Sequence, residues 1–423
     1  MFRGDLSDMI KFLVYDFGLY MTQANALADG GKNRVKYFTP WAGRDPHYKD
    51  FIIGKGFEYL EKELYFEPWK KWADVIVFFD VSGNSICHDL REQYGDKKSI
   101  WGCGKAELLE NDRVLFKEWC KELGLDVNKY VVVKGVTELK KELKKSNGNR
   151  YVKVQIFRGD VETFFCEDYD SGESIIDQEI IPHLGVDKED FEFIVEEPID
   201  KVAEPGADIF FNKHGVLGGF YGYEVDKALY IGKRIDDELP EPLQETLDAF
   251  TPLLVKLGYA GALSTEEVFS ADGKHVWIDA CQRIPNPLGA LYGCNKVISN
   301  WPEFVAGVGR NEYIRPEINF KYVGAFPVSS CYAKDSYVKV DIKDEDKVKY
   351  QICCAKEKIV KSVPGWEVVG VLLGWGNTVD EVINMLKENA EYIKGHGVDT
   401  SPVNAIDNVK EVIEKGKKVG IPF

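Results

Sequence analysis

One apolar run limits the folds open to this chain more than any other segment: Ala73-Asp74-Val75-Ile76-Val77-Phe78-Phe79-Asp80. A strand with one wet face alternates apolar and polar residues, whereas a strand covered on both faces is apolar almost throughout. The run is therefore typical of a parallel strand packed between helices. Together with β-rich runs at 10–15 and 35–38 and a helix-compatible stretch through 23–27, it predicts a small α/β layer domain over residues 9–103.

The composition is that of an ordinary folded protein of several domains. The chain has 423 residues, of which 44% are hydrophobic and 29% charged, which sets aside disorder, collagen and a disulfide scaffold. Lys and Arg total 54 against 70 Asp and Glu, a net charge of −16. Nucleic acids are bound mainly through Lys and Arg, so this balance argues against a nucleic-acid partner.

The cysteines and the apolar runs indicate a cytoplasmic protein. The nine cysteines include no C-x2-C pair, as expected for a reducing compartment. The N-terminus predicts a first strand and not a signal peptide. No run of about 18 apolar residues occurs, so we expect no membrane span. A homo-oligomer is compatible with the sequence, which does not reveal exposed apolar patches.

The middle of the chain predicts a second, larger body with helices and antiparallel strands. Helices are expected at 111–123, at 137–145 and from near Pro242. Strands are expected at 130–133, 151–155, 161–165, 192–196, 207–211, 216–221, 261–269 and 274–281. The last two meet at Asp272-Gly273, a dipeptide typical of hairpin turns.

The C-terminal part predicts an α+β cap. Strands are expected at 320–328, 337–343, 349–354 and 367–373, followed by helices at 378–394 and 405–418. We therefore expect three domains, 1–103, 104–330 and 331–423, of mixed α/β and α+β class.

Lys153 is the first candidate binding residue. It lies in the strand-like segment Tyr151-Val152-Lys153-Val154, before the turn Ile156-Phe157-Arg158-Gly159-Asp160. A lysine on one face of a strand is usually a solvated edge residue. Beside a glycine-containing turn, it can also reach phosphates that the turn covers.

Paired carboxylates follow an apolar strand further on. Phe193-Ile194-Val195 runs into Glu196-Glu197-Pro198-Ile199, and Glu204 lies seven positions after Glu197. Such pairs are most often surface charge. Because this strand is apolar enough to be buried, its terminal carboxylates are candidates to line a cleft and to accept ribose hydroxyls, and the strand edge offers backbone groups to an adenine.

Acidic residues in the two strands around Asp272-Gly273 form the most informative pattern. Glu266 and Glu267 lie in the first strand and Asp279 in the second. Acids on adjacent buried strands repel one another unless they are neutralised. A Mg²⁺ ion that bridges them to a polyphosphate removes this repulsion, because Mg²⁺ prefers oxygen ligands. The alternative is a salt bridge from Asp279 to Arg283, and whether Glu266 or Glu267 is the ligand stays open.

In their order and spacing these residues resemble the ATP-grasp superfamily. The matching features are a strand lysine before a small turn, the hinge glutamates, a carboxylate on each side of a D-G turn, and an arginine after the second one. The resemblance implies an ATP-grasp fold with a pre-ATP-grasp domain (1–103), a nucleotide-binding body (104–330) and a C-terminal domain (331–423). It also implies ATP and Mg²⁺ as cofactors.

The resemblance assigns a role to each matching residue. Lys153 and Arg113 would hold the α and β phosphates, the segment from Glu196 through Glu197 to Ile199 would take adenine, and Glu204 would take the ribose. Glu266 and Asp279 would bind Mg²⁺, and Arg283 would stabilise an acyl phosphate. Lys227 would reach the γ-phosphate, and Arg158 in the turn is a further catalytic candidate.

Two further segments resemble particular ligases. Residues 368–381 look like the C-terminal domain of phosphoribosylamine-glycine ligases. The string Arg158-Gly159-Asp160-Val161-Glu162-Thr163 looks like bacteriophage ATP-grasp proteins labelled by that ligase name. The implied reaction is ATP-dependent activation of a small-molecule carboxylate to an acyl phosphate, attack by an amine to form a C–N bond, and release of ADP and phosphate.

One departure keeps two alternatives open. The family pattern E-x-N-x-R reads here Asp279-Ala280-Cys281-Gln282-Arg283, and a thiol suits Mg²⁺ poorly. The chain could therefore bind nucleotide without ligase turnover. A small-molecule kinase on the same fold is the other alternative.

Overall fold

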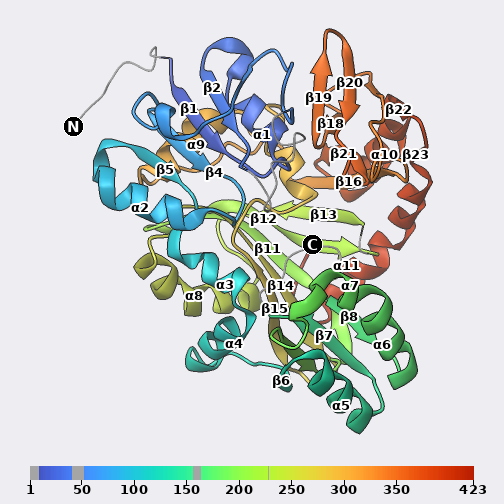
Figure 1. The fold of residues 1–423 in the computed structure, drawn as a ribbon. Helices are drawn as coiled ribbons and strands as arrows, with labels where there is room; N and C mark the ends of the chain where they lie inside the picture. The colour runs from blue at the N-terminus through green and yellow to red at the C-terminus, as the bar shows by residue number, and fades with distance from the viewer. Residues whose placement is uncertain (1–8, 41–51, 156–162, 227) are drawn as a thin grey trace. The chain divides into compact units, whose positions relative to one another are not determined.

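The computed structural model describes residues 9–40, 52–155, 163–226 and 228–423 (Figure 1). The chain divides into two compact units. Unit 1 comprises Met1–Glu107, Pro205–Thr265 and Cys281–Phe423, and unit 2 comprises Leu108–Glu204 and Glu266–Ala280. The chain thus enters and leaves unit 2 twice. The predicted domain boundaries at 103/104 and 330/331 follow a different partition and stay a prediction.

Unit 1 contains a parallel sheet of the kind predicted. Its strand order is β3-β2-β1-β4-β5, and every pairing is parallel. β4 is buried at all four positions, which confirms a strand covered on both faces. The order reverses between β1 and β4, so the carboxyl ends of these two strands flank the switch point. The elements are β1 (Lys11–Tyr15), α1 (Met21–Ala26), β2 (Arg34–Phe38), β3 (Leu60–Glu63), β4 (Val75–Phe78), α2 (Asn84–Tyr94) and β5 (Ser99–Trp101).

Unit 1 also contains most of a large antiparallel sheet. The strands run in the order β14-β11-β12-β13-β16-β21-β18, with β15 beside β14 and β23 beside β16. The bounds are β11 (Pro205–Asn212), β12 (Gly215–Val225), β13 (Leu229–Arg234), β14 (Gly261–Ser270), β15 (His275–Cys281), β16 (Tyr322–Ser330), β18 (Val348–Tyr350), β21 (Val368–Gly376) and β23 (Val398–Asp399). β14 and β15 each have one end in unit 1 and the other in unit 2. The predicted hairpin at 261–281 is confirmed.

The remaining elements of unit 1 include the predicted C-terminal helices. They are α8 (Glu241–Lys256), α9 (Trp301–Gly309), β17 (Val340–Ile342), β19 (Cys353–Lys356), β20 (Ile359–Ser362), α10 (Val379–Asn389), β22 (Ile393–Gly395) and α11 (Val409–Lys417). The prediction of one strand over 349–354 is wrong. β18 and β19 are separate there, because Ile352 has a positive φ of 44° that interrupts the extended backbone.

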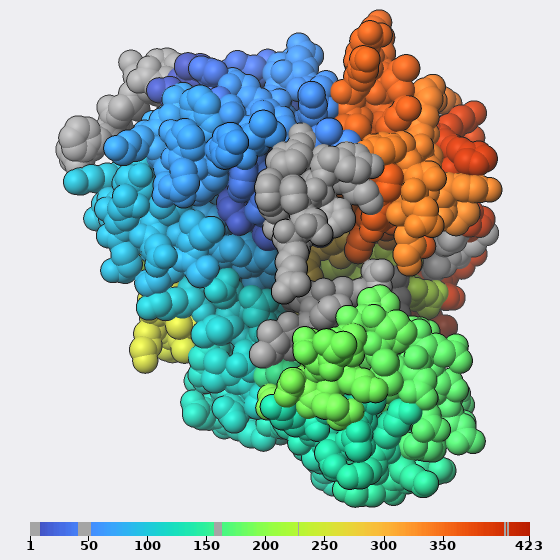
Figure 2. Space-filling view, viewed as in Figure 1, coloured from blue at the N-terminus to red at the C-terminus, as the bar shows by residue number. Residues whose placement is uncertain are grey.

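Unit 2 is built on a four-stranded antiparallel sheet of order β6-β9-β7-β8. In Figure 2 its residues 108–204 gather in one body coloured from teal to light green. The bounds are α3 (Leu108–Asn111), α4 (Arg113–Glu122), β6 (Tyr130–Lys134), α5 (Val136–Ser146), β7 (Arg150–Val154), β8 (Thr163–Cys166), α6 (Tyr169–Ile175), α7 (Ile181–Leu184), β9 (Glu192–Glu196) and β10 (Lys201–Ala203), with a π-helical turn over Ile176–Ile180. β7 and β8 form the predicted hairpin, in which Lys153 pairs with Thr163.

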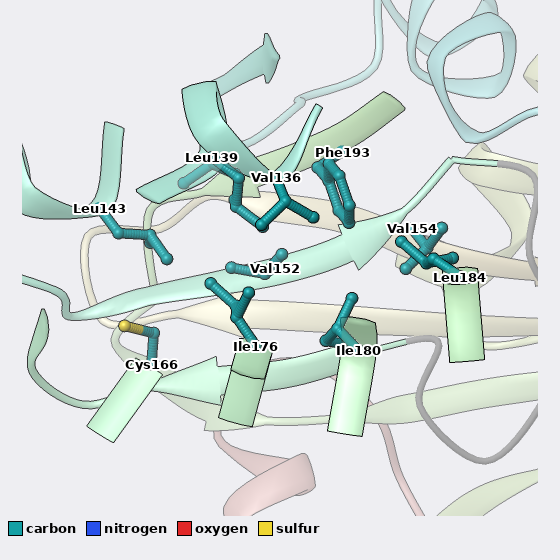
Figure 3. Close-up of a cluster of buried hydrophobic side chains, with 11 residues drawn as sticks. Val136, Leu139, Leu143, Val152, Val154, Cys166, Ile176, Ile180, Leu184 and Phe193 are labelled. Atoms are coloured by element: carbon teal, nitrogen blue, oxygen red, sulfur yellow. The ribbon is translucent and has the colours of Figure 1, made fainter. Parts of the chain in front are cut away.

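The hydrophobic core of unit 2 covers one face of its four-stranded sheet, so a site can form only on the opposite face. Leu139 and Leu143 of α5 pack with Val152 of β7 and with Phe193 of β9, and all four are fully buried (Figure 3). Side chains alternate along a strand, so Val152 and Val154 belong to this core face. Lys153 therefore projects from the opposite face of the sheet.

In the described part of the chain, every helix is too short or too polar to cross a bilayer.

Candidate functional site

Lys153 lies on the non-core face of the unit 2 sheet, and it is only 7% exposed. Its backbone pairs with Ile194 of β9. The Nζ atom lies 3.8 Å from Oε2 of Glu196 and donates a hydrogen bond of 3.2 Å to the Ile278 carbonyl of β15. Lys153 is therefore not the solvated edge residue that a strand lysine usually is. Lys153 is a buried cation held over the sheet.

A second lysine, Lys117 of α4, meets the same carboxylate. Its Nζ lies 2.7 Å from Oε1 of Glu196, and it donates a hydrogen bond of 3.0 Å to Asn128 Oδ1. Asn128 Nδ2 in turn donates to Oε2 of Glu196 at 3.1 Å. We call Lys117, Asn128, Lys153 and Glu196 the Glu196 cluster. It places two buried cations around one buried carboxylate.

The pKa values in the Glu196 cluster follow from the ratio of two lysines to one carboxylate. Burial raises the pKa of Glu196, but the charges of Lys153 and Lys117 oppose it, and the net pKa is lowered. Burial lowers the pKa of Lys117, and Lys153 lowers it further against the attraction of Glu196. Because a buried charge is costly unless it is paired, the surplus positive charge favours an anion on this face.

Arg113 is held beside the same strand. It is the first residue of α4, whose N-cap Asp112 accepts a hydrogen bond of 3.0 Å from the Leu115 amide. Arg113 is 5% exposed, and its NH1 donates to the Val154 carbonyl at 2.7 Å. The structure thus brings together three of the predicted nucleotide residues of unit 2: Arg113, Lys153 and Glu196.

The other predicted nucleotide residues lie further along the chain. Glu197 has a side chain that is 46% exposed and lies 3.8 Å from Lys129 and 3.7 Å from Arg150. Ile199 is half-buried in the segment between β9 and β10. Glu204 forms an ion pair with Lys201. Burial lowers the pKa of Lys201, but Glu204 and Glu266 raise it, and the net pKa is raised. Lys201 therefore lies within the field of both carboxylates.

The acids of β14 and β15 differ in burial and direction. Glu267 is fully buried, and its Oε2 lies 2.5 Å from Nε2 of His275, whereas Glu266 is half-buried. Alternation along each strand gives Asp279 the same face as His275, and Glu266 the face opposite to Glu267. Glu267 and Asp279 therefore share a face. Strand alternation thus favours Glu267 as the partner of Asp279, whereas the sequence pattern favours Glu266, and the choice between them stays a prediction.

The donor set fits Mg²⁺ only in combination with other oxygens. Asp279 Oδ1 accepts a hydrogen bond of 3.1 Å from the Ala280 amide. Among the described residues, no three His, Cys, Asp or Glu side chains are grouped to hold a metal ion. Mg²⁺ usually takes one or two carboxylates together with phosphate and water oxygens. Two carboxylates are therefore sufficient protein ligands for it.

Arg283 belongs to unit 1. Its NH1 lies 3.4 Å from the Tyr20 hydroxyl, and its NH2 donates to Cys281 Sγ at 3.8 Å. The Cys281 thiol thus contacts the predicted catalytic arginine. Arg158 and Lys227, the other two catalytic candidates, lie outside the described residues.

Unit 1 has its own buried carboxylates, Asp16 and Asp80, which follow β1 and β4 at the switch point of the parallel sheet. Asp16 is fully buried and accepts hydrogen bonds from the Tyr20 amide at 3.0 Å and from the Tyr37 hydroxyl. Burial raises the pKa of Asp16 to about 7, the Tyr37 hydrogen bond opposes the rise, and the Asp80 charge adds to it.

Sequence reasoning missed Lys117, Asn128 and His275. Lys117 had a readable signal, because it follows Arg113 by four positions and lies next to Phe116 on the face of α4 that also carries Cys120, and all of these are buried. Side chains four apart share a helix face, so a lysine on an otherwise buried face stands out. Asn128 lies in a connecting segment and carried no comparable pattern.

The chain as a whole resembles solved structures in its fold. No family model and no curated protein matches it. Among solved structures, phosphoribosylamine-glycine ligase from Thermotoga maritima is similar with a TM-score of 0.66 at 16% identity, over 92% of this chain and 98% of that one. The biotin carboxylase domain of 2-oxoglutarate carboxylase from Hydrogenobacter thermophilus, in complex with MgADP, ADP and bicarbonate, gives 0.66 at 15% identity, over 97% and 99%.

A third structure agrees with these two. N5-carboxyaminoimidazole ribonucleotide synthetase from Thermotoga maritima gives a TM-score of 0.59 at 13% identity, over 92% of this chain and all of that one (100%). The likeness spans nearly the full length of each protein and includes both units. The chain therefore has the ATP-grasp fold expected from its motifs, and in that fold it resembles phosphoribosylamine-glycine ligase.

Proposed function

We propose that this protein is an ATP- and Mg²⁺-dependent ligase that joins a small-molecule carboxylate to an amine through an acyl phosphate. ADP and phosphate are the other products. The solved structures of similar fold support this proposal, since they include ligases and a carboxylase domain bound to MgADP.

The observation that carries the proposal is the surplus positive charge of the Glu196 cluster. Lys117 and Lys153 are both nearly buried, and they share one carboxylate. Arg113 of α4 donates to the Val154 carbonyl at the end of β7, and we assign these three buried cations of unit 2 to the phosphates of ATP. Phosphoryl transfer depends mainly on such positioning and charge neutralisation.

Each residue then has a role in this proposal. Lys153 and Arg113 hold the α and β phosphates, and the backbone from Glu196 through Glu197 to Ile199 receives adenine. The Glu196 side chain is engaged by both lysines, so it orients them. Glu204 accepts the ribose hydroxyls.

Mg²⁺ would be held by Asp279 and by Glu266 or Glu267. When bound, it neutralises phosphate charge and polarises the γ-phosphate for transfer to the carboxylate. Arg283 stabilises the acyl phosphate. Lys227 and Arg158 are assigned to the γ-phosphate and the catalytic turn from the sequence pattern.

A thermal melt with and without Mg-ATP is the first test. Ligand at 100 times its dissociation constant adds about 2.7 kcal/mol to stability, which we expect to appear as a higher melting temperature that requires Mg²⁺. Asp279→Asn should remove both the Mg²⁺ dependence and ADP formation while the protein stays folded. Unchanged ADP formation in this variant would contradict the metal assignment.

Glu266→Gln and Glu267→Gln form a matched pair for the second ligand. The variant of the true ligand should lose the Mg²⁺-dependent shift and the other should keep it. Loss of folding in Glu267→Gln, whose carboxylate is buried against His275, would be distinguished by a melt without ligand.

A second candidate function is nucleotide binding without turnover. The observation that favours it is the Cys281 thiol in contact with Arg283, where the family has an oxygen ligand. We expect Cys281→Asn to increase Mg²⁺-dependent ATP hydrolysis if the chain has lost ligase activity. Amine-dependent release of free phosphate by the unmodified protein would instead favour the ligase over both this candidate and a kinase, in which the phosphate stays on the product.

A further inference from the structure

A cavity of unit 1 is separate from the predicted nucleotide and metal residues. It measures about 210 Å³ and is bordered by α1, by residues 293–295 and by the segment that leads into β18. None of the described residues predicted for nucleotide, metal or catalysis lines it. Pockets for drug-sized ligands measure roughly 300–1,000 Å³, so the ligand that fits this one is small.

Lys349 supplies a buried cation to the cavity. It is the central residue of β18, its backbone pairs with Val371 of β21, and it is 9% exposed. Its ammonium makes no hydrogen bond or ion pair with any residue in the described part of the chain. Burial raises the pKa of Cys294, and the charge of Lys349 opposes that rise. Because an unpaired buried ammonium is costly, a bound anion would stabilise it.

Acceptors line other parts of the same cavity. Glu345 and Asp346 both border it, and Asp346 is already paired with Lys296 at 2.9 Å. Glu345 has no ion pair among the described side chains. Asn25 of α1 also lines the cavity, and its buried Oδ1 has no donor within the described ranges. A carboxylate and an amide oxygen are therefore available for a group with N–H donors.

We propose that this cavity binds a small zwitterion of the amino-acid type. Its carboxylate would lie against Lys349 and its ammonium would donate to Glu345 and to Asn25 Oδ1. A simple anion would satisfy Lys349 but would meet the negative charges of Glu345 and Asp346. A simple cation would satisfy Glu345 but would leave Lys349 unpaired. Binding does not depend on the proposed ligase activity, which uses none of these residues.

The test measures melting temperature and heat of binding with the full chain. The probes are glycine, L-alanine and β-alanine, with acetate and methylammonium chloride at equal ionic strength as half-ligands. The variants are Lys349→Met and Glu345→Gln, and the matched control is Lys358→Met, which removes an exposed lysine of the same C-terminal region. We expect at least one amino acid to bind, and to bind more tightly than either half-ligand.

Lys349→Met should weaken that binding at least about tenfold, equal to about 1.4 kcal/mol, and Glu345→Gln should also weaken it. Without ligand, the melting temperature of Lys349→Met should equal or exceed that of the unmodified protein, since an unpaired buried charge is removed. If Lys349→Met does not fold, Glu345→Gln and the half-ligands still decide the result. Binding of acetate as tight as that of the amino acids, binding by Lys349→Met as tight as by Lys358→Met, or no binding of any amino acid would overturn the proposal.

Discussion

Glu196 in unit 2 and Asp16 in unit 1 are both almost completely buried, with 3% and 0% exposure, yet their pKa values move in opposite directions. Burial raises both. For Glu196 the charges of Lys153 and Lys117 outweigh burial. For Asp16 a tyrosine hydroxyl and backbone amides oppose burial, and the neighbouring Asp80 adds to it, so the pKa reaches about 7.

The difference shows that partners, and not burial alone, decide the charge of an enclosed carboxylate. In unit 2 a carboxylate with a lowered pKa pairs with two lysines and leaves a surplus positive charge. In unit 1 the carboxylate at the end of β1 holds its proton up to neutral pH. The two regions therefore differ in the charge that their buried carboxylates carry near neutral pH.

Removal of the carboxylate in unit 2 should have the largest effect. Glu196→Gln leaves Lys117 and Lys153 buried without a counter-charge, and we expect the free energy of unfolding to fall by about 3–5 kcal/mol. The neighbouring Glu197→Gln is the matched control, since its exposed ion pairs contribute at most about 1 kcal/mol. Urea unfolding midpoints measure both variants. Equal midpoints would show that the two lysines do not depend on Glu196.

Replacement of the carboxylate in unit 1 should change the pH dependence of stability. The folded pKa of Asp16 is about 7, against about 3.9 in the unfolded chain. Its contribution is therefore present below about pH 4 and is lost as the pH rises to about 7, by at most about 4 kcal/mol. Glu196 has the opposite sign, because its lowered pKa gives stability that is lost as the pH falls.

Asp16→Asn should remove the loss of stability that accompanies the rise in pH. Melting temperatures between about pH 5 and pH 8 test this, with the exposed Asp237→Asn as control. An Asp16→Asn profile that still declines as steeply as that of the unmodified protein would assign the effect to another group, such as Asp208, whose pKa burial raises to about 6.

Removal of one lysine should separate activity from stability in unit 2. In Lys153→Met the Glu196 carboxylate keeps Lys117 at 2.7 Å, so we expect a smaller loss of stability than in Glu196→Gln. ADP formation should fall about 10²–10³-fold, as when one stabilising donor is removed from an active site. Lys129→Met, whose side chain is 85% exposed, should keep full activity. Full activity in Lys153→Met would remove the phosphate role.

The smallest effect concerns the hydroxyl that contacts Asp16. The Tyr37 hydrogen bond lowers the pKa of Asp16, so Tyr37→Phe should move the midpoint of the pH profile to higher pH. The accompanying loss of stability should be about 1 kcal/mol, typical of one hydrogen bond. A midpoint that moves to lower pH would show that the hydroxyl favours the protonated form.

The sequence predicted the elements whose patterns are local. The apolar run at β4, the hairpin around Asp272-Gly273 and the helix at 111–123 all appear in the structure, because burial on both faces, turn chemistry and helical periodicity each leave a mark within a few residues. The contact of Asp16 with Tyr37 could not be predicted, since these residues lie on different strands and only the sheet order joins them. Lys117 was missed although its place on a buried helix face is a local signal.

The two separate segments of unit 2 bear on the order in which the protein can fold. Residues Glu266–Ala280 complete unit 2, and β10 pairs with Phe269 and Ser270 at the end of β14. During synthesis the first segment of unit 2, Leu108–Glu204, is followed by Pro205–Thr265 of unit 1. The second segment of unit 2, the hairpin segment Glu266–Ala280, is made only after that. Unit 2 therefore stays incomplete while β11, β12 and β13 are synthesised. Its completion requires closure of the long loop formed by Pro205–Thr265. The segment that carries the predicted metal ligands is thus also the last piece that this unit receives.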